Sequence, residues 1–206
     1  MGARERARPR RARGVDEGRF LGLRGDHRTA GGPRLPGGEV LLGEGGRHIE
    51  YPIHTRLMEA RLDVASVVHS HAPSACVFAS LDVPLRALSH DAVPFLAPDI
   101  PRFYESGDLI RDDRTGSALA DTVGDSAGAL IPGHGLVTVG SSLAVAVMRA
   151  VLLERACRNQ LQALSAGGPA RWSNEAEIAS KRETVWSEEQ YRAGYDYLVR
   201  RADAVG

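Results

Sequence analysis

The sequence contains few of the residues that mark several common classes of protein. Among its 206 residues there are two cysteines and one lysine, Lys181, and the formal net charge is zero. Without an excess of either charge, we expect neither nucleic acid nor a membrane surface as a partner of the whole chain. No apolar run approaches the roughly 20 residues of a membrane-spanning helix, and the first residues lack the apolar stretch of a signal peptide. The expected location is therefore the cytoplasm.

The low cysteine count argues against a fold held by disulfides. Cys76 and Cys157 both lie in apolar stretches of the sequence. Buried free thiols are predicted, in preference to a disulfide or a catalytic thiol.

Residues 1–36 differ in composition from the rest of the chain. They contain ten arginines, many glycines and no periodic apolar pattern, which predicts an irregular or poorly ordered basic arm. A nucleic-acid-binding arm is disfavoured, because four acidic residues interrupt the segment and no aromatic residues alternate with the arginines. Residues 37–206 are predicted to form one catalytic domain with a helical tail at its C-terminal end.

Short apolar runs alternate with helical patterns from Gly37 onward. Strands are predicted over residues 39–42, 65–68, 93–96, 129–131 and 136–139, and helices over 50–62, 73–80, 115–123 and 141–164. Residues 173–200 are predicted to form one or two amphipathic helices. Alternation of this kind without an internal repeat favours an α/β fold.

The first chemical signal is His69-Ser70-His71, at the end of a predicted strand. Alternate residues of an extended segment point to the same side, so two imidazoles can face one point in space. Neutral imidazole is a ligand for Zn²⁺ and related divalent ions. The alternative is a pair of ordinary histidines at a strand end.

A third histidine and a glutamate add to this signal. His134 lies between Gly133 and Gly135, which permit unusual backbone angles and close approach of neighbouring groups. With His69 and His71 it would complete a facial set of three ligands. Glu50, at the start of a predicted helix, is a further ligand or a general acid/base. The alternative for Glu50 is a carboxylate favoured there by the helix dipole.

These motifs together are similar to those of a known family. The segments Glu50-x3-His54, 61–71 (Arg-Leu-Asp-Val-Ala-Ser-Val-Val-His-Ser-His) and 133–140 (Gly-His-Gly-Leu-Val-Thr-Val-Gly) resemble the class II aldolase/adducin family. The resemblance extends over roughly residues 38–165.

The resemblance implies a fold, a metal site and an assembly. The fold would be a three-layer α/β/α sandwich around a mixed, largely antiparallel sheet. His69, His71 and His134 would hold a divalent metal, with Zn²⁺ expected and Mn²⁺, Fe²⁺ or Co²⁺ as alternatives. Glu50 would be a fourth ligand and acid/base group. Members of the family are usually homotetramers with sites at subunit interfaces, so a homo-oligomer acting on a small molecule is expected.

The sequence departs from the sugar-phosphate aldolases of this family. Arg47, His48 and Ile49 precede Glu50 where the aldolases carry two serines, and no Gly-Asn-x-Ser-x-Arg element lies near the N-terminus. Phosphate binding needs clustered N–H and hydroxyl donors. A sugar phosphate is therefore a disfavoured substrate.

A second departure favours another reaction. His90 lies where the aldolases carry a catalytic tyrosine, and with Pro84-Leu85-Arg86 and the long tail it resembles the decarboxylase branch of the family. That branch acts on carboxylated aromatic or muconic semialdehyde substrates, including dihydroxyphthalates. Loss of CO₂ beside a carbonyl or a phenol leaves negative charge that a metal can stabilise on oxygen.

Further candidate residues follow from this chemistry. His90 or Glu50 would supply the proton that replaces CO₂. His54 could orient Glu50 and His48 could reach the substrate. A remaining substrate carboxylate could pair with an arginine; the candidates are Arg47, Arg86 and Arg102.

Two other functions remain open at this level. One is an aldolase or epimerase that acts on a small sugar. The other is a non-catalytic structural module like adducin, although the retained histidines count against it.

Overall fold

The computed structural model describes residues 48–204 of the chain. Along the sequence the elements are α1 (Tyr51–Ala60), β1 (Ser66–Ser70), α2 (Pro73–Ala79), the 3₁₀ helix η2 (His90–Phe95), α3 (Asp113–Val123), β2 (Gly128–Ile131), β3 (Gly135–Gly140), α4 (Leu143–Ser165), α5 (Glu175–Thr184) and α6 (Glu188–Asp203). The predicted arm over residues 1–36 and the predicted strand over 39–42 lie outside the described residues.

The described strands form one sheet in the order β1-β3-β2, and both pairs are antiparallel. His69 of β1 is opposite Val137 of β3, and Leu130 of β2 is opposite Leu136 of β3. A single parallel bridge, between Arg102 and Leu130, extends the edge at β2. The predicted mixed, largely antiparallel sheet is therefore confirmed within residues 48–204.

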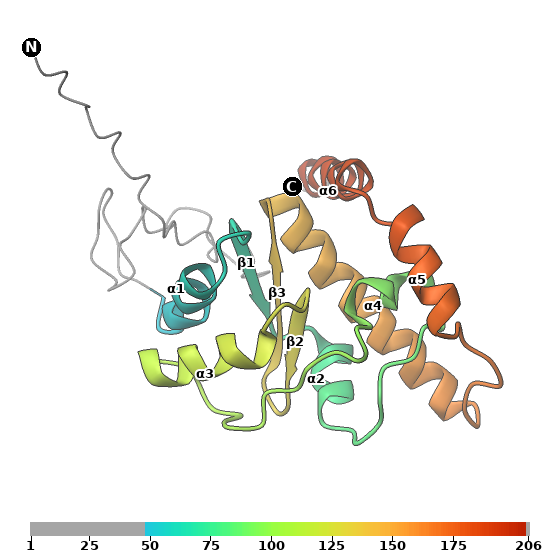
Figure 1. The fold of residues 1–206 in the computed structure, drawn as a ribbon, viewed down its shortest axis with the longest axis horizontal. Helices are drawn as coiled ribbons and strands as arrows, with labels where there is room; N and C mark the ends of the chain where they lie inside the picture. Colours follow the sequence, from blue (N-terminus) through green and yellow to red (C-terminus); the bar gives the residue numbers. More distant parts are fainter. Residues whose placement is uncertain (1–47, 205–206) are drawn as a thin grey trace, which may run out of the picture.

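Alternation along the strands sends side chains into two separate cores. Val67, Val137 and Val139 pack in one core with residues of α1 and α3. Val68 and Leu136 pack in the other core with residues of α2 and α4. Figure 1 shows α1 and α3 on one side of the sheet and α2 and α4 on the other. The predicted three-layer α/β/α sandwich is confirmed.

The predicted strand over residues 93–96 is wrong, because residues 93–95 belong to the 3₁₀ helix η2 and Leu96 is its C-cap. Ser89 caps the start of η2, since its Oγ accepts a hydrogen bond from the Asp91 backbone N–H. Pro94 has no N–H to donate to a neighbouring strand. Apolar composition suggested a strand, but the serine cap and the proline determine the local structure.

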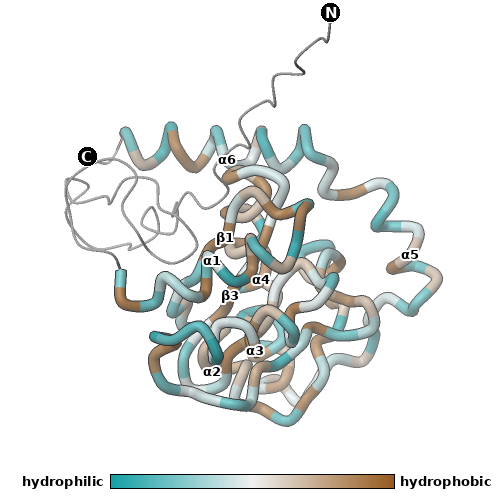
Figure 2. Tube along the Cα trace, turned by 60° about the vertical axis from the view of Figure 1, so that its left-hand side comes forward, coloured by the Kyte–Doolittle hydropathy of each residue, from teal (hydrophilic) through white to brown (hydrophobic). Residues whose placement is uncertain are grey.

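The tail forms two helices that differ in their burial. α5 and α6 each begin with a reciprocal capping box, at Asn174 with Glu177 and at Ser187 with Gln190. Tyr191 of α6 is buried against α4, and Figure 2 shows hydrophilic and hydrophobic residues mixed along α6. α6 is thus an amphipathic helix laid over the outside of α4. Between residues 48 and 204, no helix has the length and apolarity to cross a membrane.

Candidate metal centre

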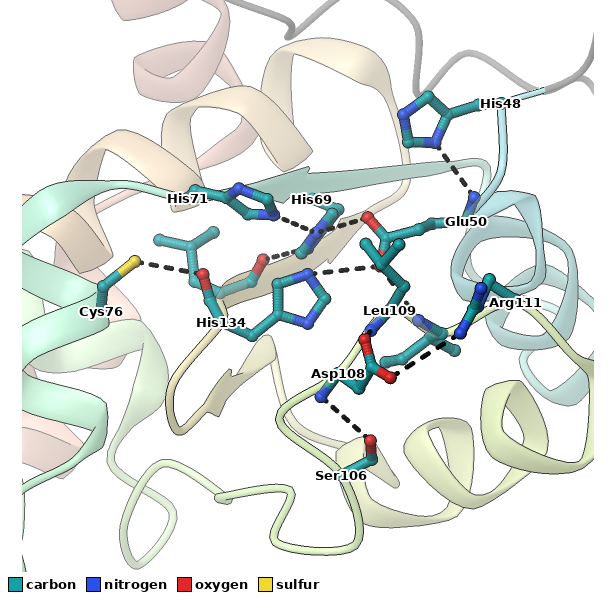
Figure 3. A network of polar contacts seen from close by, with 12 residues as sticks. His48, Glu50, His69, His71, Cys76, Ser106, Asp108, Leu109, Arg111 and His134 are labelled. Carbon is teal, nitrogen blue, oxygen red and sulfur yellow. Dashed lines mark hydrogen bonds and ion pairs between the residues drawn. The ribbon is translucent and has the colours of Figure 1, made fainter.

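Four side chains from separate parts of the chain meet at one end of the sheet. Glu50 lies at the N-cap of α1, His69 in β1, His71 directly after β1, and His134 in the turn between β2 and β3. One ligand atom from each lies within 4.8 Å of the others, as Figure 3 illustrates. The structure brings together all four residues predicted to surround the metal.

The glycines on either side of His134, one in the turn before β3 and one at the start of β3, let His134 approach the other histidines. Gly133 has a φ of 73°, a left-handed conformation that glycine adopts without steric cost. A Cβ atom on Gly135 would collide with the carbonyl oxygen of Ser70. Glycine at position 135 therefore permits β3 to pass close to β1 where His69 and His71 leave the strand.

The hydrogen bonds of His69 direct one of its ring nitrogens toward the cluster. Its Nδ1 donates to the Leu136 carbonyl oxygen at 2.9 Å, which leaves Nε2 facing the cluster. That Nε2 lies 3.2 Å from Nε2 of His71. Fixing a histidine tautomer through a backbone carbonyl is the usual way in which proteins orient metal-binding imidazoles.

His134 provides a test of whether these residues fit a metal. It is 8% exposed, and neither ring nitrogen has a hydrogen-bond partner within residues 48–204. Its Nε2 lies 3.3 Å from Glu50 Oε1 without hydrogen-bond geometry. Buried polar atoms are normally satisfied, and three imidazoles with one carboxylate are ligands that Zn²⁺ accepts. The donor set therefore fits a divalent metal.

Glu50 is a buried carboxylate held in its ionised form. Burial raises the pKa of Glu50, but His134, His69 and the backbone N–H of Ile110 outweigh burial and hold that pKa well below its usual range. The Ile110 N–H donates to Oε1 at 3.0 Å, and the other carboxylate oxygen lies 3.5 Å from His69 Nε2. An ionised carboxylate can ligate a cation or accept a proton.

Burial lowers the pKa of His71, and the neighbouring His69 and His134 lower it further. The neutral imidazole that this favours is the form that binds metals.

The structure places His48 and His54 beside Glu50 but outside the group of four. His48 is exposed, and its Nδ1 accepts a hydrogen bond from the Glu50 backbone N–H at 3.2 Å. His54 is 3% exposed on α1, one turn after Glu50. Both positions are consistent with supporting roles, which remain predictions.

His90 does not join the cluster within one chain. It is exposed at the start of η2, which packs against α4 and α5. The indole Nε1 of Trp186 donates to the His90 carbonyl oxygen at 2.8 Å. Trp186 has a φ of 63°, so the tail holds this segment through a residue in an uncommon backbone conformation.

Two of the arginines predicted to bind a substrate carboxylate contact other groups of the described chain. The Arg86 guanidinium lies 4.9 Å from the ring centre of Trp172. Arg102 donates to the Val83 carbonyl oxygen at 2.6 Å and pairs with Asp99. Arg47 lies outside the described residues.

Both cysteines are free thiols, as predicted. Cys157 is fully buried, and burial raises its pKa to about 12. Cys76 is only half-buried, and its thiol donates to the His134 carbonyl oxygen at 3.2 Å. Burial also raises the pKa of Cys76, so this thiol stays protonated as a donor.

Three positions near the cluster carry no obvious motif in the sequence. They are Ile110, which holds Glu50, its neighbour Arg111, and Glu154, whose carboxylate accepts hydrogen bonds from the backbone N–H groups of Ser74 and Ala75 just after His71. One sequence feature could have indicated the role of Glu154. Ala72, the N-cap residue of α2, cannot cap the helix with its own side chain, so the cap has to come from another residue.

A three-layer sandwich that gathers three histidines and a glutamate at the end of its sheet defines a class II aldolase-like protein. The sequence matches the Class II Aldolase and Adducin N-terminal domain over residues 34–161, and the chain belongs to this family.

Similar proteins include several decarboxylases. A 3,4-dihydroxyphthalate decarboxylase of Rhodococcus jostii (strain RHA1) is 28% identical over 163 residues, which cover 70% of this chain and 64% of that protein. Decarboxylase NovR of Streptomyces niveus is 32% identical over 139 residues, covering 66% of this chain and 51% of that protein. The matched region thus spans between half and two thirds of the length of these relatives.

Solved structures show the same fold. An aldolase II superfamily protein from Pseudomonas syringae has a TM-score of 0.71 and 24% identity, covering 86% of this chain and 74% of that one. An L-fuculose 1-phosphate aldolase from Glaciozyma antarctica PI12 has a TM-score of 0.64 and 24% identity, covering 79% and 65%. At this identity the likeness concerns the fold alone.

Proposed function

We propose that the protein is a metal-dependent decarboxylase of a hydroxylated aromatic carboxylic acid, of which a dihydroxyphthalate is the first candidate. The observation that carries the proposal is the convergence of Glu50, His69, His71 and His134 within 4.8 Å. The decarboxylase names of several relatives support the choice of reaction.

The three histidines would hold the metal through their Nε2 atoms, and Glu50 would be a fourth ligand or the neighbouring base. Zn²⁺ is the first candidate, with Mn²⁺, Fe²⁺ and Co²⁺ as alternatives. When bound, a divalent metal stabilises the negative charge that develops on a substrate oxygen as CO₂ leaves.

The reaction also needs a proton donor. The bond between the ring carbon and the carboxylate breaks, its electron pair stays on the ring carbon, and a proton takes the place of CO₂. Because Glu50 is held ionised, it would have to accept a proton before donating one. His90 is the other candidate, and it would approach the cluster from a second subunit. A homo-oligomer, with a tetramer as the first candidate, belongs to this proposal.

We propose that Arg111 binds the carboxylate that remains on the product. It follows Ile110, whose N–H holds Glu50, and Figure 3 shows it beside the cluster. The Arg111 side chain is 56% exposed, and its guanidinium lies 3.7 Å from the carboxylate of the still more exposed Asp108. A surface pair of this kind contributes little free energy, so the guanidinium can turn to a bidentate partner.

The alternatives differ in their products. An aldolase or epimerase acting on a small sugar or sugar phosphate would share the fold and the metal, but the segment before Glu50 has no serine to hold a phosphate. A non-catalytic module would not need four converging ligands, which favours the enzyme.

Metal content and CO₂ release test the proposal together. Protein purified without chelator should contain about one divalent ion per chain and release CO₂ from 3,4-dihydroxyphthalate. His69→Ala and His134→Ala should abolish both, while His27→Ala, outside the matched region, should change neither. Absence of a bound ion from the wild type would contradict the proposal, and cleavage products without CO₂ would favour the aldolase.

A further inference from the structure

Helix α2 begins two residues after His71 but has no local residue that caps it. Ala72 is its N-cap and Pro73 its first residue, so neither can accept a hydrogen bond through a side chain. The backbone N–H groups of Ser74 and Ala75 donate instead to the two oxygens of Glu154, at 3.0 and 2.8 Å. A carboxylate about 80 residues further along the chain thus completes the first turn of α2.

The same short helix also contacts the segment that carries His134. The Cys76 thiol donates to the His134 carbonyl oxygen at 3.2 Å. The Gly133 N–H donates to Oγ of Ser80, the C-cap residue of α2, at 3.4 Å. α2 therefore begins two residues after one histidine of the cluster, and its Cys76 is hydrogen-bonded to the backbone of another.

Glu154 belongs to a helix that is packed into the hydrophobic core. It lies on α4, the longest helix of the described chain, where the neighbouring Leu152 and Leu153 are fully buried. Hydrogen bonds from N–H groups to a carboxylate are shorter and stronger than those between neutral groups, and the start of a helix favours negative charge. α4, whose inner face is buried, thus provides the point to which the start of α2 is hydrogen-bonded.

Local caps are missing at the two helices that adjoin the cluster. α3, α4, α5 and α6 each have a side-chain cap from their own N-cap residue, whereas α1 and α2 have none. At α1 the carboxylate of the N-cap residue Glu50 faces the histidines instead. At α2 the cap comes from Glu154, which makes the start of that helix depend on α4.

We propose that Glu154 is a positioning residue of the metal centre, which fixes α2 and through it the placement of His71 and the His134 turn. The inference rests on the proposed function insofar as the cluster must bind a metal. Residues that orient metal ligands without touching the metal typically change metal affinity by about 10- to 100-fold when replaced. A loss of that size is expected for Glu154→Ala.

The experiment measures metal affinity rather than turnover. Wild-type protein, Glu154→Ala, Glu154→Gln and Asn174→Ala are stripped of metal, and their Zn²⁺ affinities are measured by competition with a chromophoric chelator. The absorption spectrum of bound Co²⁺ reports the ligand geometry. Asn174→Ala is the matched control, because it removes the cap of α5, a helix that carries no residue of the cluster.

We expect a weakening of about 10- to 100-fold and an altered Co²⁺ spectrum for Glu154→Ala, and an intermediate result for Glu154→Gln, which keeps one acceptor oxygen. Asn174→Ala should match the wild type. Equal affinity and spectra for Glu154→Ala and the wild type would overturn the proposal, as would an equal loss in Asn174→Ala. If Glu154→Ala does not fold, Glu154→Gln decides by the same criteria. A wild type that binds no Zn²⁺ would refute the proposed function itself.

Discussion

At the scale of single residues, the cluster combines three imidazoles with one ionised carboxylate. Burial and neighbouring histidines lower the pKa of His71, while His134, His69 and the Ile110 N–H keep Glu50 ionised despite its burial. Both protonation states are those of metal ligands. Arg111 follows Ile110, whose N–H binds Glu50. The same loop would therefore position both a ligand of the metal and the positive group that binds the substrate carboxylate.

Replacing Arg111 should separate two substrates that differ by a single carboxylate. In the proposed reaction, 3,4-dihydroxyphthalate would lose the carboxylate beside a hydroxyl and keep the other. The acid 2,3-dihydroxybenzoate has a carboxylate beside a hydroxyl but lacks the second carboxylate. Arg111→Gln should lower kcat/KM for 3,4-dihydroxyphthalate by about 10- to 100-fold, since a hydrogen bond to a charged group contributes roughly 1.5–3 kcal/mol. Steady-state rates of CO₂ release from both acids measure the difference.

The control for this experiment is Arg86→Gln, because the Arg86 guanidinium is held over Trp172. It should leave both rates close to those of the wild type. Where 2,3-dihydroxybenzoate is not turned over, inhibition by 3,4-dihydroxybenzoate and by catechol gives the same comparison. If Arg111→Gln weakened turnover of both substrates equally, or binding of both inhibitors equally, Arg111 would not recognise the retained carboxylate.

At the scale of elements, α1 and α3, which form one helical layer, pack in close contact. A Cβ atom on Gly116 of α3 would lie 2.9 Å from both Cβ and the carbonyl oxygen of Pro52. Gly116→Ala should therefore force the helices apart and cost about 1–3 kcal/mol, the usual cost of overpacking. Denaturant unfolding of the metal-free protein measures the change.

Ser117→Ala is the matched control on the same helix, since Ser117 is exposed. Its free energy of unfolding should stay within about 0.5 kcal/mol of the wild type. If Gly116→Ala were as stable as this control, close approach of the two helices would not contribute to stability.

Much of the secondary structure could be predicted because its determinants are local. Ser142 caps α4, and the glycines after Ser165 end it, so the helix predicted over residues 141–164 closely matches the observed Leu143–Ser165. The strand predicted over 93–96 failed because apolar composition alone cannot distinguish a buried strand from a short helix. Pro94 and the Ser89 cap were the contrary signals.

The donor set could be predicted, but its supports could not. The alternation of His69 and His71, the glycines around His134 and the family spacing to Glu50 are all visible in the sequence. The bond from Ile110 to Glu50 spans 60 residues, and those from Ser74 and Ala75 to Glu154 span 80 and 79. No local pattern encodes such contacts, since they exist only once the layers have packed.

At the scale of the whole molecule, the cluster joins parts that pack in different layers. Glu50 begins a helix of one layer, His69 lies in the sheet, and His71 leads into α2 of the opposite layer. A metal held by all of them would bind the folded chain far more tightly than the unfolded one. Metal binding should therefore stabilise the fold as a whole and not only the site.

Thermal unfolding with and without metal tests this coupling. A free Zn²⁺ concentration 100 times the dissociation constant should add about 2.7 kcal/mol, which raises Tm by roughly 5–11 °C for a chain of this size. A chelator should reverse the shift, and His134→Ala should abolish it. His90→Ala should keep the full shift even if it loses activity, because His90 is not part of the cluster. A Tm that does not depend on metal in the wild type, or a shift that survives His134→Ala, would mean that the cluster does not hold the ion.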